Sequence, residues 1–287
     1  MIALLGASGY VGQTFQAELE KRNLKYIPVS RKDTDYYDLF KLKEFIKNNS
    51  IKFLINAAGF TGKPNVDQCE VKKRDAIMGN VMLPKIISLA CLSEKINWGH
   101  VSSGCLYSGD NGGGGFTEDD EPNFSFDSES YSFYSGSKAL AEKILKEDPT
   151  CYIWRLRMPF DNINGPRNYL SKLIKYEKTY HDTNSMSHRS HFVKYCMDLY
   201  ELNAPFGIYN ITNDGYISTR EIVQMMKEIL NLEKEFIFFE DGKEFLKSIK
   251  APRSNCILDV SKLKSTGVSV MHCRDAIEEA LRSWRNE

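Results

Sequence analysis

Short apolar runs alternate with amphipathic helical patterns over the first 160 residues of the chain. The apolar runs have the length of buried strands and lie at about 2–5, 26–29, 53–55, 98–102 and 151–156. Helical periodicity follows the earlier runs, with a helix starting near residue 11 and others at about 38–48, 66–78, 81–94 and 132–146. This alternation predicts an α/β fold built on a doubly wound parallel sheet.

The pattern changes after residue 160, where a loop is followed by shorter helices and one further strand. We therefore expect a first domain at 1–160 and a smaller C-terminal α/β domain at 161–287. The strand expected at 207–212 could instead pair with the first sheet. A polar, glycine-rich loop at 108–130 is long for a connection without secondary structure, and such loops are usually functional.

Three glycines separate the first strand from the first helix, in the pattern Gly6-x-x-Gly9-x-x-Gly12. Glycines at such a turn let backbone N–H groups approach a pyrophosphate, which then lies at the positive end of the helix. The strand–turn–helix context predicts a Rossmann-type dinucleotide site in preference to a tight turn without a ligand.

The second strand ends in Ser30-Arg31-Lys32, which bears on the choice of dinucleotide. An acidic residue there would bind the ribose of NADH, whereas an arginine suits the 2′-phosphate of NADPH. We expect NADPH in preference to NADH. A solvated pair of surface cations is the alternative interpretation.

Tyr134 and Lys138 lie four positions apart near the start of the helix expected at 132–146, so they share a helix face. An ammonium group beside a phenol lowers the pKa of the phenol, which prepares it to give a proton to a carbonyl oxygen. Tyr37 and Lys41 have the same spacing. They belong to the second strand–helix unit, where exposed helix positions are the better interpretation.

The fourth strand ends in the polar sequence Ser102-Ser103-Gly104-Cys105. Neighbours in an extended strand point to opposite faces, so Ser103 and Cys105 are expected on one side and Ser102 on the other. A lone cysteine is more often a small buried apolar residue than a base. The position beside Ser103 favours a chemical role for Cys105.

The order of glycine turn, Ser103, and Tyr134 with Lys138 resembles the extended branch of the short-chain dehydrogenase/reductase superfamily. Further stretches resemble, more narrowly, the nucleotide-rhamnose synthase family of bifunctional 3,5-epimerase/4-reductases. These stretches are Asn56–Glu70, Ser103–Cys105, Arg157–Pro159, Pro166–Asn168, Asn184–Met186, Ala251–Asn255 and Leu258–Leu263. The resemblance covers nearly the whole chain.

The resemblance implies a substrate, UDP-4-keto-6-deoxy-D-glucose, and a product, UDP-L-rhamnose. Cys105 as base and Lys172 as acid would epimerise C3 and C5, although the two roles could be exchanged. Tyr134 and Lys138 would reduce C4 with hydride from NADPH, while Ser103 binds O4.

The resemblance also implies which residues bind the ligands. Substrate would contact Asn65, Asn168 and Arg253, the last at the diphosphate unless it forms a salt bridge to the first domain. The cofactor would contact Gly6, Ser8, Gly9, Tyr10, Val11, Gly12, Arg31, Ala57, Ala58, Gly59, Tyr134 and Lys138.

Composition narrows the possible partners. Lys+Arg and Asp+Glu both number 38, so nothing favours a nucleic acid or a membrane surface as a partner. The seven cysteines lack CxxC spacing and indicate free thiols in a reducing, cytoplasmic compartment. No metal site is expected from the five histidines. No apolar run approaches the length needed to span a bilayer, so we expect no transmembrane helix.

Two other functions remain open at this stage. One is a 4-reductase of the dTDP-4-dehydrorhamnose type without epimerase activity, and the other is a non-catalytic NADP-binding regulatory subunit. A homodimer is also left open. The 4,6-dehydratase that makes the keto sugar is expected to be a separate chain.

Overall fold

The computed structural model describes residues 1–63 and 65–286, and its centre is a six-stranded sheet in which every pairing is parallel. The strand order is β2-β1-β3-β4-β5-β9. The strands are β1 (Ile2–Leu5), β2 (Tyr26–Val29), β3 (Phe53–Asn56), β4 (Asn97–Ser103), β5 (Cys151–Leu156) and β9 (Gly207–Asn210). The doubly wound, Rossmann-type sheet expected from the sequence is confirmed.

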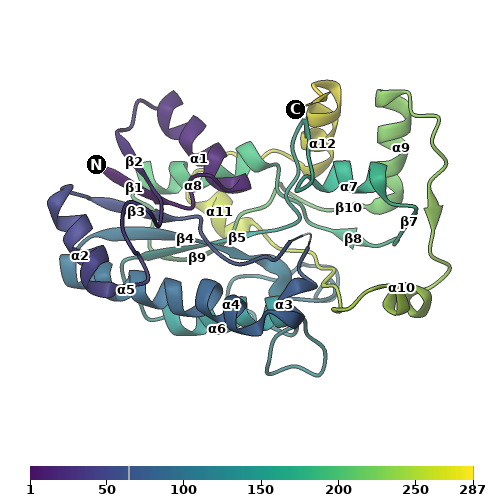
Figure 1. The fold of residues 1–287 in the computed structure, drawn as a ribbon. Helices are drawn as coiled ribbons and strands as arrows, with labels where there is room; N and C mark the ends of the chain where they lie inside the picture. Colours follow the sequence, from purple (N-terminus) through teal and green to yellow (C-terminus); the bar gives the residue numbers. More distant parts are fainter. Residues whose placement is uncertain (64, 287) are drawn as a thin grey trace.

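Helices cover both faces of this sheet (Figure 1). One face carries α1 (Tyr10–Lys21), α8 (Arg189–Glu201) and α11 (Ser261–Ser265). The other face carries α2 (Leu39–Asn48), α5 (Leu83–Glu94) and α6 (Phe133–Leu145). Two buried clusters of apolar side chains, one per face, hold these layers together.

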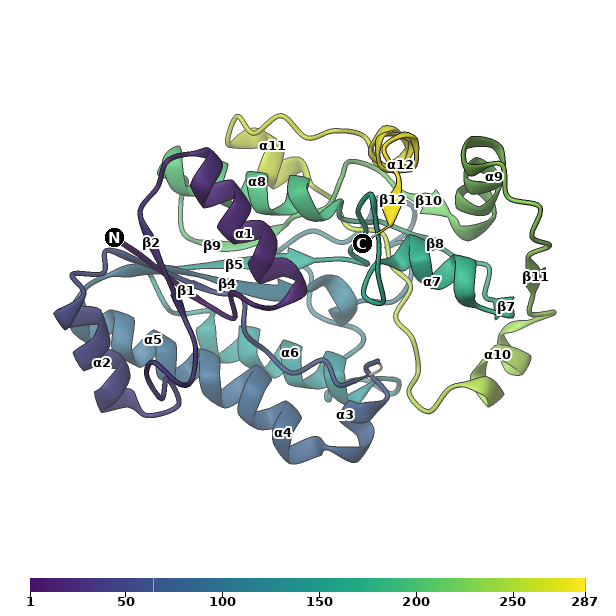
Figure 2. The ribbon, with the colours of Figure 1, turned by 45° about the horizontal axis from the view of Figure 1, so that its top comes forward.

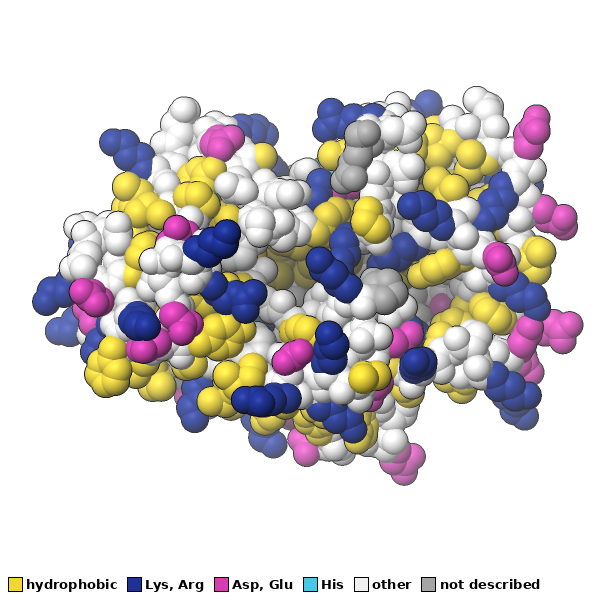
Figure 3. Space-filling model, viewed as in Figure 1, with side chains coloured by type: hydrophobic (Ala, Val, Ile, Leu, Met, Phe, Trp, Pro, Cys, Tyr) yellow, Lys and Arg dark blue, Asp and Glu magenta, His cyan; other side chains and the backbone are white. Residues whose placement is uncertain are grey.

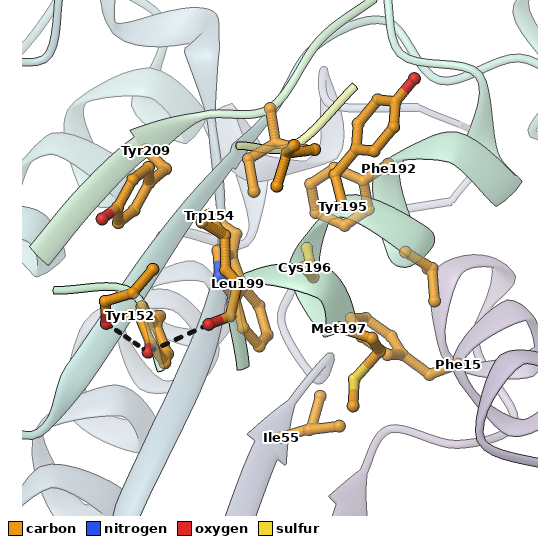
Figure 4. Close-up of a cluster of buried hydrophobic side chains, with 14 of the residues drawn as sticks. Phe15, Ile55, Tyr152, Trp154, Phe192, Tyr195, Cys196, Met197, Leu199 and Tyr209 are labelled. Carbon is orange, nitrogen blue, oxygen red and sulfur yellow. Dashed lines mark hydrogen bonds between the residues drawn. The ribbon is translucent and has the colours of Figure 1, made fainter. Parts of the chain in front are cut away.

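Aromatic side chains dominate the cluster under α1 and α8 (Figure 4). Trp154 on β5 stacks on Phe15 of α1, with ring centroids 5.9 Å apart. Tyr152 donates its hydroxyl to the backbone oxygens of Leu199 and Ala204, at 3.4 and 2.6 Å. This network ties β5 to α8, which comes from the second half of the chain.

A short helix, α3 (Gln68–Val71), is followed by one continuous helix where the sequence analysis expected a break near residue 80. This helix consists of α4 (Lys73–Ile77), a π turn (Met78–Met82) and α5. The π turn replaces the expected break because Asn80 holds it against Phe60, accepting from its N–H at 2.8 Å and donating to its carbonyl oxygen at 2.9 Å.

The stretch Lys73–Glu94 is also long and apolar enough to cross a bilayer by length and composition, contrary to the sequence-based expectation. Of its most apolar window, 56% is buried inside the protein. Core helices pass the same test, and α5 packs its apolar face on the sheet.

The second lobe lies beyond the carboxyl ends of the strands (Figure 2). It has its own apolar core and is built on α7 (Tyr169–Lys175), α9 (Thr219–Leu230), α10 (Gly242–Ser248) and α12 (Cys273–Arg282). Three small pairs of strands complete it: β6 (Ile163–Asn164) with β12 (Arg285–Asn286), β7 (Lys178–Thr179) with β11 (Ile237–Phe238), and β8 (Thr183–Asn184) with β10 (Ile217–Ser218).

The division into domains at residue 160 stays a prediction. β9 pairs with β5 in the central sheet, so the strand expected at 207–212 lies there. α8 and α11 also pack on that sheet. Much of the sequence after residue 160 therefore contributes to the first lobe, and the second lobe is not one continuous segment.

Candidate active site

A cavity of about 970 Å³ lies between the carboxyl ends of the strands and the second lobe. In the surface view the molecule is hollowed between the two lobes, and Lys and Arg side chains stand around the hollow (Figure 3). The cavity lining comes from the glycine turn, the ends of β3, β4 and β5, α6, α7 and residues 248–255. Doubly wound sheets bind ligands at this edge.

The glycine turn forms one end of the cavity. Gly6 has φ +76°, and a Cβ there would lie 2.6 Å from Ala58 N; a Cβ on Gly12 would lie 2.0 Å from Gly6 O. These two glycines therefore shape the turn, and they lie outside the cavity lining. Residues 8–11 line the cavity at the start of α1. The backbone of that turn can thus face a phosphate.

Ala57, Ala58 and Gly59, which are expected to contact the cofactor, line the cavity just after β3. Their contact with a cofactor stays a prediction. Arg31 is exposed after β2 and lies outside the lining of this cavity. The role of Arg31 at a 2′-phosphate stays a prediction.

Ser103 and Cys105 both line the cavity, but the strand argument that paired them is wrong. β4 ends at Ser103, and residues Gly104–Leu106 form a 3₁₀ turn in which side chains no longer alternate. The Ser103 hydroxyl accepts a hydrogen bond from Cys105 N at 3.3 Å, which fixes the turn. Burial raises the pKa of the Cys105 thiol to about 11.

Ser102 also belongs to the cavity lining, but its hydroxyl is engaged in a buried ionic cluster. It is 2% exposed and donates its hydroxyl to Glu142 of α6. Arg155 of β5 binds the other carboxylate oxygen of Glu142 through Nε at 3.0 Å and Nη2 at 2.8 Å. This cluster fixes α6 against β4 and β5.

Helix α6 presents Tyr134 and Lys138 to the cavity. It begins at a capping box in which Ser132 and Ser135 satisfy each other's backbone N–H groups. Lys138 Nζ donates to Val101 O at 2.9 Å, and burial lowers the pKa of Lys138 to about 8. Tyr37 and Lys41, which share the spacing, lie outside the cavity lining.

The expected lowering of the Tyr134 pKa is not found in this structure. Burial raises the pKa of the Tyr134 phenol, and the neighbouring Cys105 acts in the same direction. A hydrogen bond with the Ser103 side chain opposes them. The phenol is therefore held protonated, as a proton donor must be.

Sequence reasoning missed two residues behind Lys138. His100 of β4 is fully buried, with Nε2 3.4 Å from Lys138 Nζ. Asn56 of β3 lies beside it, with Nδ2 3.0 Å from His100 Nδ1. The two residues are register partners in adjacent strands, and the strand register is not readable from the sequence.

The second lobe contributes Lys172 on α7 and Arg253 to the lining. Burial lowers the pKa of Lys172, and the nearby Arg167 and Arg253 lower it further. Arg253 Nη1 lies 2.8 Å from Asp67 Oδ1 in the first lobe. Arg253 thus forms the salt bridge to the first lobe and also lines the cavity, and its contact with a substrate diphosphate stays a prediction.

Arg167 is another residue that the sequence analysis missed. It lines the cavity and donates to Thr61 Oγ1 and Gly62 O, both at 2.9 Å, so it joins the two lobes. It belongs to the Pro166–Asn168 stretch, in which the resemblance points to Asn168 instead.

The expected substrate role of Asn168 does not fit the structure. Asn168 is 0% exposed and lies outside the cavity lining. Its Oδ1 caps α7 at Leu170 N, and its Nδ2 donates to Asp161 and to Ile163 O. Its polar atoms are thus engaged in holding the start of α7, which positions Lys172. Asn65, in contrast, does line the cavity.

All seven cysteines are unpaired and buried. Within residues 1–63 and 65–286, no group of three or more His, Cys, Asp or Glu side chains is arranged to hold a metal ion. Ser103, Cys105, Tyr134, Lys138 and Lys172 all line the cavity.

Comparison with known proteins gives a consistent match over the whole chain. Residues 1–286 match the family described as RmlD substrate binding domain. A bifunctional dTDP-4-dehydrorhamnose 3,5-epimerase/dTDP-4-dehydrorhamnose reductase of Arabidopsis thaliana is 31% identical over 283 residues, covering 96% of this chain and 90% of that protein.

A trifunctional UDP-glucose 4,6-dehydratase/UDP-4-keto-6-deoxy-D-glucose 3,5-epimerase/UDP-4-keto-L-rhamnose-reductase of the same plant is also 31% identical, over 280 residues. The chain spans only 40% of the length of that relative. Among solved structures, the L780 UDP-rhamnose synthase of Acanthamoeba polyphaga mimivirus has a TM-score of 0.90 at 23% identity, covering 99% of both chains.

Proposed function

The chain belongs to the RmlD substrate-binding-domain family, and we propose that it is an NADPH-dependent enzyme that converts UDP-4-keto-6-deoxy-D-glucose to UDP-L-rhamnose. The general activity is reduction of a nucleotide-sugar ketone at C4, and the names of both relatives include such a reductase. The finer part is epimerisation at C3 and C5 in the same site.

One observation supports both reactions: Ser103, Cys105, Tyr134, Lys138 and Lys172 all line one cavity. Tyr134 and Lys138 come from α6, Ser103 and Cys105 from the end of β4, and Lys172 from the second lobe. Reduction alone would need Tyr134, Lys138 and Ser103. Lys172 and the Cys105 thiol add an acid–base pair that reduction does not require.

The residues at the glycine turn fit a dinucleotide. The turn from residue 8 to 11 would hold the pyrophosphate, and Ala57, Ala58 and Gly59 would lie beside it. NADPH, when bound, supplies the hydride for C4. A solved dTDP-4-dehydrorhamnose reductase of Bacillus anthracis in complex with NADP has the same fold, with a TM-score of 0.82 at 19% identity.

In the C4 reduction, Tyr134 gives its phenol proton to the ketone oxygen. Its raised pKa keeps that proton in place until negative charge develops on the oxygen. Ser103, which lines the cavity beside it, hydrogen-bonds the same oxygen. Lys138, in its ammonium form, stabilises the phenolate that remains.

For the epimerisations, we propose the exchanged form of the two roles that the resemblance implies. The C4 ketone acidifies the C3 and C5 protons, since the carbanion is an enolate. Burial raises the pKa of Cys105 and lowers that of Lys172. We therefore propose Lys172 as the base and the thiol of Cys105 as the acid that protonates the opposite face.

The product of the reaction tests the proposal. The protein with NADPH and UDP-4-keto-6-deoxy-D-glucose should give UDP-L-rhamnose by mass and NMR, and a parallel reaction with the dTDP sugar measures the choice of nucleotide. In deuterated water without NADPH, deuterium should enter C3 and C5. Reduction without this exchange would leave a simple 4-reductase.

Cys105→Ala should lose formation of the epimerised keto sugar by about 10²–10⁴-fold, because the acid that protonates the opposite face of C3 and C5 is removed. NMR of the keto sugars without NADPH measures this loss. The same variant should still reduce UDP-4-keto-L-rhamnose, which is already epimerised, and this activity is the control for folding. Epimerisation at the unchanged rate would contradict the role of Cys105.

Arg31→Ala should raise the KM for NADPH by roughly 10–100-fold, because a charge-assisted hydrogen bond to the 2′-phosphate is lost. The KM for NADH should stay the same. Lys32→Ala is the matched control, since Lys32 is the neighbouring exposed cation. Equal effects of Arg31→Ala on both cofactors would place the 2′-phosphate elsewhere.

Other expectations stay proposals. The keto-sugar substrate requires a 4,6-dehydratase, which we place on a separate chain, although the trifunctional relative carries that activity in its own name. We likewise propose a cytoplasmic location and leave open a homodimer.

A further inference from the structure

A buried row of polar groups runs behind the cavity and ends at Lys138. It starts at the backbone N–H of Ala58, which donates to Asn56 Oδ1 at 3.1 Å. It continues from Asn56 Nδ2 to His100 Nδ1 at 3.0 Å, and from His100 Nε2 to Lys138 Nζ at 3.4 Å. Asn56 and His100 are both 0% exposed. Both side chains therefore need hydrogen-bond partners inside the protein.

The backbone fixes the direction of the Asn56 amide. The Ala58 N–H needs an acceptor, so Oδ1 must face it and Nδ2 must face His100. Turning the amide over would place two donors against each other. Nδ1 of His100 therefore receives a hydrogen bond. A neutral imidazole has one N–H, so the hydrogen of His100 must be on Nε2.

That hydrogen points at Lys138 Nζ. A neutral amine can accept it with its lone pair and still donate to Val101 O, the 2.9 Å contact. An ammonium group has no lone pair, and its hydrogen would meet the hydrogen on Nε2. The row as built therefore fits the amine form of Lys138 and disfavours the ammonium form.

We infer that His100 is a positioning residue for C4 reduction: Asn56 holds it with hydrogen on Nε2, and it thereby stabilises the neutral amine of Lys138. This inference rests on the proposed roles of Tyr134 and Lys138. After Tyr134 has given its proton to O4, one proton moves from the Lys138 ammonium to the Tyr134 phenolate. A neutral phenol and a neutral amine remain, and the amine is the form that His100 accommodates.

The surroundings of Lys138 shift its pKa in opposite directions. Burial lowers the pKa of Lys138 to about 8, while Cys105 and Glu142 raise it. The Glu142 carboxylate is already bound by Arg155 and Ser102. Burial also holds the pKa of His100 well below its usual value, so the ring stays neutral while Lys138 changes charge.

The tautomer of His100 can be measured directly and without substrate. In the protein labelled with ¹⁵N histidine, the imidazole signals assigned by comparison with His100→Gln should show Nε2 carrying the hydrogen and Nδ1 bare. Hydrogen on Nδ1 would overturn the inference. This result does not depend on whether the protein reduces any sugar, so it separates failure of the inference from failure of the proposed function.

Asn56→Asp tests whether Asn56 acts on Lys138 through His100. A carboxylate would accept from Nδ1–H and switch the tautomer, which turns Nε2 into an acceptor for the Lys138 ammonium. The pKa of Lys138, followed by NMR of ¹³C-labelled lysine, should rise by about one unit or more. In active protein, the pH dependence of kcat for C4 reduction should move in the same direction.

His100→Leu supplies the matched background. If the coupling passes through the imidazole, Asn56→Asp should shift the Lys138 titration much less when His100 is leucine. An equal shift of the Lys138 pKa in both backgrounds would mean that the new charge acts through space. No shift in either background would mean that His100 does not control the pKa of Lys138. Both outcomes would overturn the inference.

Discussion

Tyr134→Phe should lower kcat for C4 reduction by about 10²–10⁴-fold, the contribution expected from one well-placed general acid. The variant keeps the ring and loses only the hydroxyl. That hydroxyl is the proposed proton donor, and burial raises its pKa. It belongs to the cavity lining together with Ser103. Steady-state oxidation of NADPH with UDP-4-keto-L-rhamnose measures the effect.

Tyr131→Phe is the control, because Tyr131 lies on the loop before the same helix and is 41% exposed. It should leave kcat unchanged. Tyr134→Phe should also keep deuterium exchange at C3 and C5, since the proposed acid–base pair for those centres is Cys105 with Lys172. A loss of less than tenfold in reduction would contradict the role of Tyr134.

Arg155→Met should lower the free energy of unfolding by about 3–5 kcal/mol, because it leaves the buried carboxylate of Glu142 without its counter-charge. Arg155 and Glu142 are only 2% and 4% exposed. Equilibrium unfolding in urea or guanidinium chloride measures the change.

The matched control is Arg282→Met, which breaks an ion pair to Glu278 on α12 whose side chains are 67% and 42% exposed. It should cost no more than about 1 kcal/mol, as surface pairs do. The double variant Arg155→Met/Glu142→Leu should recover much of the loss, since neither charge is then left unpaired. A cost for Arg155→Met that matches the surface control would contradict this account.

The features predicted well from the sequence are those set by local pattern. Strand and helix order follows from the periodicity of apolar residues, and the glycine turn follows from the backbone geometry that only glycine permits at Gly6. Tyr134 and Lys138 line the cavity together because the spacing of four is a property of any helix.

The features that were missed depend on contacts between distant segments. His100 and Asn56 meet through strand register, which neither strand encodes alone. Asn168 was read as a ligand, yet it caps α7 from the inside. Cys105 lines the cavity for a different reason from the one expected, since the chain leaves strand geometry at Ser103 and turns.

The last strand of the sheet has a consequence for how the protein can be divided. β9 covers the open side of β5, and α8 covers the aromatic rings of Tyr152 and Trp154. A fragment ending at residue 160 would lose both, and β5 would become an edge strand with free hydrogen-bonding groups beside a bare aromatic surface. Such edges promote aggregation. We therefore expect that residues 1–160 do not fold on their own. Substitutions in α8 should also destabilise the sheet that carries the glycine turn.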